Sequence, residues 1–292
     1  MISASVQLYV QQWLKDTMGA VPASLQCTPV GGGSINETYR ITVGKRSFFC
    51  KINSLAKFPS LFACEQKGLE LLAQQGIIRV PQVAVCGHAG NEQILIMEWI
   101  EQGLKTDAFW ETFGEQLAAL HHITGPQFGL DSNNYMGALP QNNEPADNWI
   151  DFFIHQRLQP QVKLAVDHAL LEPVHMHLFE KLYQQLGAVF PVEPAVLLHG
   201  DLWSGNFLCD DKGKPVLIDP AVYYGHRNID IAMTTLFGGF DALFYESYQY
   251  HYPLPANYRQ QWEVCNLYPL LIHLNLFGKS YLADILNTIR RY

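Results

Sequence analysis

The sequence has little charge, no excess of positive charge and no long apolar run. Of its 292 residues 16% are charged, and 19 Lys and Arg against 27 Asp and Glu give a net charge of −8. A general nucleic-acid-binding protein needs a basic surface to neutralise phosphates, so this class is excluded. No stretch approaches the roughly eighteen consecutive apolar residues of a transmembrane helix. The first residues lack the basic start and the apolar run of a secretory signal, so we expect a cytoplasmic protein that binds no membrane.

The sequence also lacks the patterns of a disulfide scaffold and of a metal-binding histidine cluster. Its six cysteines form no CxxC pair, and the chain is too long for a small secreted scaffold, so we expect free, reduced thiols. His121-His122 and His175-x-His177 have no third ligand at a suitable spacing, and we expect surface or capping histidines there. With 48% apolar residues the chain can bury a core without cross-links, which excludes wholesale disorder.

Two parts of different composition follow one another along the chain. Segments rich in Tyr, Ile, Val and Phe predict strands over 27–30, 38–43, 47–52, 82–86 and 93–99, beside an N-terminal helix and a helix over 61–75. Helical spacing then predicts helices over 109–122, 148–168 and 172–190, with three or four more in the last sixty or so residues; a long loop covers 125–147, and short strands cover 196–198 and 216–218. We predict an α+β fold with a small lobe over 1–100 built on an antiparallel sheet, a hinge at 101–105, and a larger, mainly helical lobe over 101–292.

The strongest motif is HGDLWSGN at 199–206, followed by IDP at 218–220. Phosphoryl transfer needs one carboxylate to orient and deprotonate the acceptor hydroxyl and two oxygen ligands for Mg²⁺. The spacing D-x4-N and then D reproduces the catalytic loop and the metal-binding Asp of kinases. We therefore assign Asp201 as the general base and Asn206 and Asp219 as magnesium ligands. The alternative, in which both carboxylates only cap turns, requires Asn206 and the downstream strand to be coincidences.

Residues upstream of this motif fit nucleotide binding. Lys51 lies on a predicted strand, where a Lys can pair with α- and β-phosphate oxygens. Glu65 in the next helix can hold Lys51 by an ion pair, and Glu70 on the same helix is its rival. At the end of the last strand of this lobe, the Glu98 carbonyl and the Ile100 N–H have the offset that pairs with an adenine edge.

A glycine triplet precedes the paired strands. Gly31, Gly32, Gly33 and Ser34 are the candidate loop over the phosphates, since exposed backbone N–H groups can hold an anion. No GK[ST] follows, so the loop is not a Walker A motif, and Asn36 stands where G-x-G-x-x-G has its third glycine. A flexible turn is the alternative.

Together these motifs resemble the fructosamine kinase (ketosamine-3-kinase) family, within the aminoglycoside-phosphotransferase-like kinases. HGDLWSGN and IDPAVYYGHR…DIAM…LFGGF are typical of the family, whereas HGD with D-x4-N marks only the superfamily. The similarity runs nearly end to end, through 31–36, 49–53, 128–142, 149–158, 199–206, 218–240 and 267–277. Two departures are Asn228, where relatives more often have an acid, and Ser34, where some carry a cysteine. The second argues against redox control at that position.

The resemblance implies a bilobal protein-kinase-like fold, ATP and Mg²⁺ as cofactors, and phosphorylation of the O3 hydroxyl of ketosamines. The acceptors would be small ketosamines or glycated proteins carrying ribulosamine, erythrulosamine or fructosamine. A phosphate on O3 lies next to the C2 carbonyl, so it can be eliminated and the free amine released, which would repair glycation. The sequence does not choose among the sugars and leaves the oligomeric state open.

Other residues near the motif are candidates for contacting the acceptor or for supporting the loop. Trp203 is a candidate to stack on the acceptor, with core packing as the alternative. Tyr224 and His226, with their neighbours Tyr223 and Arg227, can line the acceptor pocket or simply pack a loop. We expect His199 and Asp230 to be structural, His199 beneath the catalytic loop and Asp230 bonded to its backbone.

Two other functions compete with this one. A related phosphotransferase for an aminoglycoside, choline or a similar amine would need an acidic pocket, but 230–277 is mostly apolar and aromatic. A catalytically silent nucleotide-binding regulator would be expected to lack Lys51, Asp201, Asn206 or Asp219, and all four are present.

Overall fold

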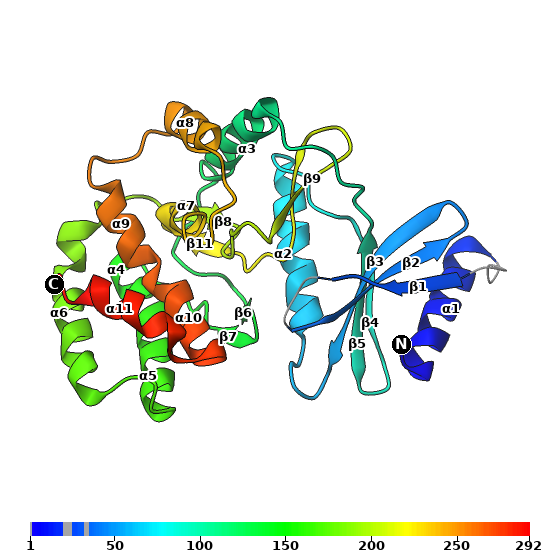
Figure 1. Cartoon of the computed structure of the whole chain (residues 1–292), viewed down its shortest axis with the longest axis horizontal. Helices are drawn as coiled ribbons and strands as arrows, with labels where there is room; N and C mark the ends of the chain where they lie inside the picture. The colour runs from blue at the N-terminus through cyan, green and yellow to red at the C-terminus, as the bar shows by residue number, and fades with distance from the viewer. Residues whose placement is uncertain (1, 20–24, 32–34) are drawn as a thin grey trace.

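The computed structural model describes residues 2–19, 25–31 and 35–292, and the N-terminal part is built on one five-stranded antiparallel sheet (Figure 1). Its strand order is β1 (Leu25–Pro29), β2 (Glu37–Val43), β3 (Arg46–Ser54), β5 (Glu92–Glu98) and β4 (Val83–Ala89). The five predicted strands are confirmed, with bounds shifted by a few residues. The turn between β2 and β3 has Gly44 at φ +58°, a conformation that favours glycine.

A helix covers each face of this sheet, because successive strand residues point to opposite faces. The buried side chains of α1 (Ala4–Met18) pack against Cys50 and Ile52 of β3 and against Ile94 and Ile96 of β5. The buried side chains of α2 (Leu61–Gln75) pack on the other face, against Leu95 and Met97. Lys51 alternates with Cys50 and Ile52, so it points toward α2. Figure 1 shows α2 standing between the sheet and the helical part of the chain.

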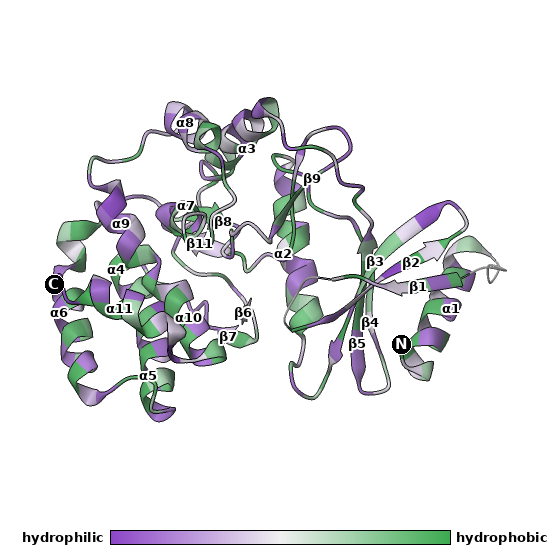
Figure 2. Ribbon diagram, viewed as in Figure 1, coloured by the Kyte–Doolittle hydropathy of each residue, from purple (hydrophilic) through white to green (hydrophobic). Residues whose placement is uncertain are grey.

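The rest of the described chain is mainly helical, as predicted. Its helices are α3 (Asp107–Leu120), α4 (Trp149–Phe152), the π-helix η1 (Phe153–Leu158), α5 (Gln159–Asp167), α6 (Pro173–Val189), α7 (Asn228–Met233), α8 (Ala242–His251), α9 (Tyr258–Cys265), α10 (Leu267–Phe277), the 3-10 helix η2 (Lys279–Tyr281) and α11 (Leu282–Ile289). Their apolar faces turn inward (Figure 2) and form two adjoining cores. No helix in the described ranges is both long and apolar enough to cross a membrane.

Four short strands flank the loops that contain the candidate site residues. β8 (Val196–Leu198) pairs with β11 (Tyr223–Gly225), and β9 (Phe207–Cys209) pairs with β10 (Pro215–Leu217), all antiparallel. The HGDLWSGN loop therefore leaves β8 and enters β9, while Asp219 follows β10. The segment expected to be a long loop contains a hairpin, β6 (Asn134–Met136) and β7 (Leu139–Gln141), so that expectation is wrong in part. The short strands predicted over 196–198 and 216–218 are present as β8 and, one residue earlier, β10, whereas β6, β7, β9 and β11 were not predicted.

Candidate active site

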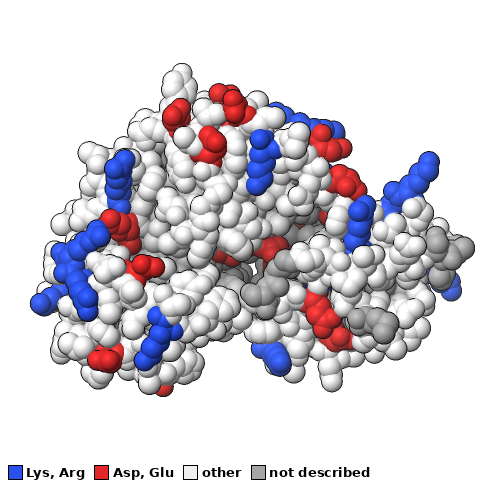
Figure 3. Space-filling model, viewed as in Figure 1, with Lys and Arg blue, Asp and Glu red and all other residues white. Residues whose placement is uncertain are grey.

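One cavity of about 440 Å³ collects most of the predicted site residues. It is lined from the sheet, from α2, from the chain after β5 and from the helical part; the predicted residues on its wall are Gly31, Lys51, Glu65, Glu98, Ile100, Asp201, Trp203, Asn206 and Asp219. Gly32, Gly33 and Ser34 lie outside the described residues. In Figure 3, acidic side chains appear in the hollow between the two parts of the molecule. A cavity of this size can take a small ligand.

Lys51 is held between two carboxylates. It is buried, with Nζ 2.7 Å from Oε1 of Glu65 and 2.6 Å from Oδ1 of Asp219. Burial lowers the pKa of Lys51, but these two carboxylates outweigh that effect and raise it, so the ammonium stays charged. Burial also raises the pKa of Glu65 to about 7, against the attraction of Lys51. The rival Glu70 is exposed and bonds to Gln66 on its own helix.

Asp201 and Asn206 occupy the same loop and contact each other. Nδ2 of Asn206 donates to the backbone oxygen of Asp201 at 2.8 Å and to its Oδ2 at 2.9 Å. Burial raises the pKa of Asp201 to about 7, and repulsion from Asp219 acts in the same direction. A carboxylate with a pKa near neutrality is well matched to general base catalysis at physiological pH.

The segment after β10 holds Asp219 in a strained conformation. Its φ is +55°, which is uncommon outside glycine and recurs at functional sites. The neighbouring catalytic loop crosses this segment so closely that a Cβ on Gly200 would lie 2.1 Å from the carbonyl oxygen of Ala221. The His199 carbonyl also accepts from Ala221 N at 2.9 Å, and His199 Nε2 bonds to the Ile218 carbonyl at 2.9 Å. The two candidate catalytic segments are thus fixed to each other.

Asp230 on α7 holds the catalytic loop from beneath. Its carboxylate is fully buried and accepts from the backbone N–H of His199 at 2.7 Å and of Gly200 at 2.8 Å. It also lies 3.3 Å from Nε2 of His121, which is fully buried and bonds to Tyr248. We expected a surface or capping role for His121; it does cap α3, but its position one turn after the buried Leu117 should have indicated burial.

The hairpin β6–β7 supports the segment beyond Asp219 through a buried amide network. Asn134 donates to the Val222 carbonyl at 2.8 Å, and Gln141 donates to the Ala221 carbonyl at 3.1 Å. Oδ1 of Asn134 in turn accepts from Gln141 at 2.8 Å and from Asn143 at 3.0 Å. All three amide side chains are buried. Sequence reasoning missed this hairpin, since its bonds join side chains to a distant backbone and leave no local pattern.

The donor set near Asp201 fits a magnesium ion brought in with a nucleotide. Because Nδ2 of Asn206 is used within its loop, its Oδ1 is the atom left for a cation. Asp219 adds carboxylate oxygens, and oxygen is the ligand that Mg²⁺ prefers. No group of three or more His, Cys, Asp or Glu in the described residues could hold a metal alone. Phosphate oxygens and water would have to complete the coordination, as is usual for this ion.

The chain after β5 leaves one backbone donor for a ligand. The Ile100 N–H has no hydrogen-bond acceptor among the described residues, and Ile100 lines the cavity. The Glu98 side chain is directed elsewhere, since it pairs with Arg79. Arg79 also bonds to Asp210 at 2.6 Å, which ties the end of β5 to the helical part.

Not every predicted acceptor-contacting residue reaches this cavity. His226 is fully buried against Trp149 and Phe190, and its pKa falls to about 4 through burial, so assigning it to the acceptor is wrong. Tyr224 lines a different cavity behind α2. Trp203 is 36% exposed and lines the cavity, so it is not a core residue. Its ring lies edge-on to that of Phe237, with 5.8 Å between the ring centroids.

The residues on the wall of the cavity that were not predicted include Tyr135 on β6 and His273 and Phe277 on α10. No motif spacing could have found them, because they come from elements far apart in the chain.

Comparison with known proteins gives a consistent picture. The sequence model of the family described as fructosamine kinase matches residues 6–292. A probable ketoamine kinase from Synechocystis is 40% identical over 273 residues, which cover 93% of this chain and 92% of that protein. The chloroplastic protein-ribulosamine 3-kinase of Arabidopsis thaliana is 35% identical, covering 97% of this chain and 87% of the relative.

Solved structures agree with the sequence relatives. A protein from Haemophilus somnus assigned as a fructosamine-3-kinase superposes with a TM-score of 0.86 at 27% identity, over 97% of this chain and 96% of the other. A thermostable aminoglycoside phosphotransferase in complex with AMP-PNP and hygromycin B gives a TM-score of 0.58 at 16% identity, over 96% and 97%. The second likeness concerns the fold alone. The predicted kinase-like fold, with an antiparallel N-terminal sheet and a helical C-terminal part, is confirmed.

Proposed function

This chain belongs to the fructosamine kinase family and is an ATP-dependent phosphotransferase acting on a hydroxyl group; we propose that its acceptor is the O3 hydroxyl of ketosamines. The single observation that carries the proposal is the meeting of Asp201, Asn206 and Asp219 in one cavity with the paired Lys51. The named activities of the ketoamine and ribulosamine kinases among its relatives support the acceptor class.

The residues divide the work of phosphoryl transfer, which depends mostly on positioning and charge neutralisation. Lys51, oriented by Glu65, would neutralise phosphate oxygens. Asn206 and Asp219 would hold Mg²⁺, which when bound neutralises charge on the phosphates. Asp201 would accept the proton of the acceptor hydroxyl as the new O–P bond forms, while the bond between the γ-phosphorus and the β-phosphate oxygen breaks and ADP leaves. The Ile100 N–H and the Glu98 carbonyl would pair with the adenine edge.

The phosphorylated product is unstable, and its breakdown indicates the role of the reaction. The phosphate is carried by C3, next to the C2 carbonyl. Loss of a proton from C1 gives the 1,2-enaminol, which expels inorganic phosphate from C3, and water then hydrolyses the resulting imine at C1 to release the amine. We therefore propose deglycation of small amines or of protein lysines as the outcome.

The direct test is an ADP-release assay with Mg·ATP and five acceptors. Ribuloselysine, erythruloselysine and fructoselysine are compared with choline and an aminoglycoside. Turnover confined to the ketosamines is expected, and the order of their kcat/KM values identifies the preferred sugar. Turnover with choline or the aminoglycoside alone would agree with kinase activity but refute the proposed role in ketosamine repair.

Trp203 is the proposed contact for the acceptor. Its exposed indole at the cavity wall can stack on the sugar or on the amine-bearing end. Trp203→Leu should raise the KM for the ketosamine and leave the urea midpoint nearly unchanged. A lower midpoint with an unaltered KM would show that the indole serves packing.

A further inference from the structure

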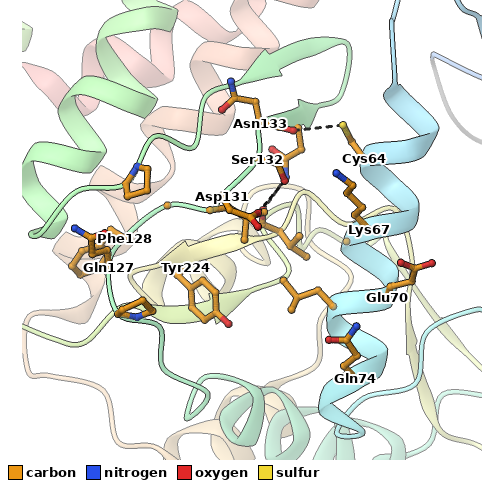
Figure 4. Close-up of a pocket in the computed structure, with 18 residues that line it drawn as sticks. Cys64, Lys67, Glu70, Gln74, Gln127, Phe128, Asp131, Ser132, Asn133 and Tyr224 are labelled. Carbon is orange, nitrogen blue, oxygen red and sulfur yellow. Dashed lines mark hydrogen bonds between the residues drawn. The ribbon is translucent and has the colours of Figure 1, made fainter.

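A second cavity lies behind α2 and is larger than the first, with a volume of about 700 Å³ (Figure 4). Its walls are α2, the segment over 126–134 and the strand β11. Cys64 and Asn134 line both cavities, so the two are neighbours. None of the proposed catalytic steps uses this second space, which is large enough for a small organic ligand.

The inner wall of this cavity is apolar and firmly packed. It is formed by Leu71, Phe128, Leu130 and Val222 and by the ring of Tyr224. Phe128 and Val222 belong to the buried cores, so they cannot move aside freely. This wall suits an apolar side chain of the ligand.

Two opposite charges face each other across the same space. Lys67 reaches in from α2 and Asp131 comes from the opposite segment (Figure 4). Glu70 of α2 also lines the cavity, but its carboxylate accepts from Gln66 of the same helix at 2.7 Å. Within the described chain neither Lys67 nor Asp131 has an oppositely charged partner within 4.0 Å. Among the described residues, the Asp131 carboxylate accepts a hydrogen bond from the Ser132 hydroxyl alone, at 3.2 Å. Lys67 on one wall and Asp131 on the other are complementary to a zwitterion.

We propose that this rear cavity binds a free α-amino acid with a large apolar side chain. The carboxylate of the ligand pairs with Lys67, its ammonium pairs with Asp131, and its side chain lies on Tyr224 and Leu71.

The position of the rear cavity couples it to the active site. Gly68 of α2 sits directly on the segment after Asp219, because a Cβ there would lie 3.3 Å from side-chain carbons of Pro220 and Val222. The same helix carries Glu65, which is bonded to Lys51 in this arrangement. A ligand that binds between α2 and 126–134 while Glu65 is bonded to Lys51 stabilises this position of α2. This coupling rests on the proposed function, and the expected effect is a lower KM for ATP.

Isothermal titration calorimetry on the full chain tests the binding. The probes are L-tryptophan, tryptamine without the carboxylate, and indole-3-propionate without the ammonium. We expect saturable binding of L-tryptophan and roughly tenfold or greater weakening for each analogue, since each loses one charge-assisted pair. Absence of saturable heat at millimolar L-tryptophan, or equal binding of either analogue, would overturn the proposal.

Surface variants locate the site. Lys67→Met and Asp131→Asn should each weaken L-tryptophan binding by about tenfold. Lys45→Met, at an exposed lysine in the β2–β3 turn, is the matched control and should leave binding unchanged. Unaltered affinity in both Lys67→Met and Asp131→Asn would refute the site.

Activity assays separate the two proposals. Binding of L-tryptophan by a chain that phosphorylates no ketosamine would keep the rear site and refute the proposed acceptor. Turnover of ketosamines by a chain that binds no L-tryptophan would do the reverse.

Discussion

Replacing Asp201 by Asn should make the protein more stable at alkaline pH and nearly inactive. The change keeps the shape of the side chain. It also keeps an oxygen that can accept from Asn206 Nδ2, which in the parent lies 2.9 Å from Oδ2 of Asp201. It removes the proposed general base, and such a base typically contributes about 10²–10⁴-fold, or roughly 3–5 kcal/mol of barrier. It also removes a charge that the folded state disfavours.

The magnitude of the stability gain follows from the pKa of Asp201, which rises from 3.8 to about 7 through burial and then through repulsion from Asp219. At 1.36 kcal/mol for each pH unit, ionising this group in the folded state costs at most about 4 kcal/mol. The folded chain binds the proton more tightly than the unfolded chain, so this cost is full above about pH 7. It shrinks as the pH falls and vanishes near pH 4.

Urea unfolding of both proteins at pH 5 and pH 8, with the ADP-release assay at pH 8, measures these effects. Asp210→Asn is the matched control with the opposite sign. Although burial opposes it, the Lys214 N–H and the Arg79 guanidinium lower the pKa of Asp210, so this variant should lose stability at neutral pH. Turnover close to normal in Asp201→Asn, or a lower stability at pH 8 than the parent, would refute the reasoning.

Three further changes test the surroundings of Asp201. Glu65→Gln should lower kcat/KM for ATP by roughly 10- to 100-fold, since Lys51 loses a charged hydrogen bond, while Glu70→Gln should change nothing in the same assay. Asn134→Ala should lower the free energy of unfolding by about 1–3 kcal/mol in urea, because the Val222 carbonyl loses its donor; an unchanged midpoint would contradict this. EDTA should abolish turnover and leave the circular dichroism spectrum unaltered, and a loss of ellipticity would point to a structural metal.

The candidate site residues that belong to one short motif or follow from local periodicity could be predicted from the sequence. HGDLWSGN places Asp201 and Asn206 in one loop wherever the chain goes, and strand alternation fixes the side to which Lys51 points. The choice of Glu65 over Glu70 was also available, because Glu65 lies one helical turn from the buried Leu61 and Leu69. The assignments of these residues to catalytic steps, like the lobe boundary near residue 100 and the cytoplasmic location, stay predictions.

Residues that depend on distant packing could not be predicted. His226 stands among polar neighbours, and only the docking of Trp149 and Phe190 buries it. His273 and Phe277 reach the cavity because α10 lies beside it, a fact of tertiary arrangement with no signal in local spacing. For the same reason the resemblance named the reaction but not the residues that select the acceptor.

The amide network of β6–β7 has a consequence for the order of folding. Asn134 and Val222 are 88 residues apart in sequence, and Gln141 reaches Ala221 across 80. Closing loops of this length costs chain entropy before any contact compensates it, so such contacts form after local helices and hairpins. The backbone beside Asp219 therefore reaches its final, strained form among the last parts of the chain to fold. We expect the hairpin and this segment to open together once formed, so that their amide protons exchange with solvent as one cooperative unit.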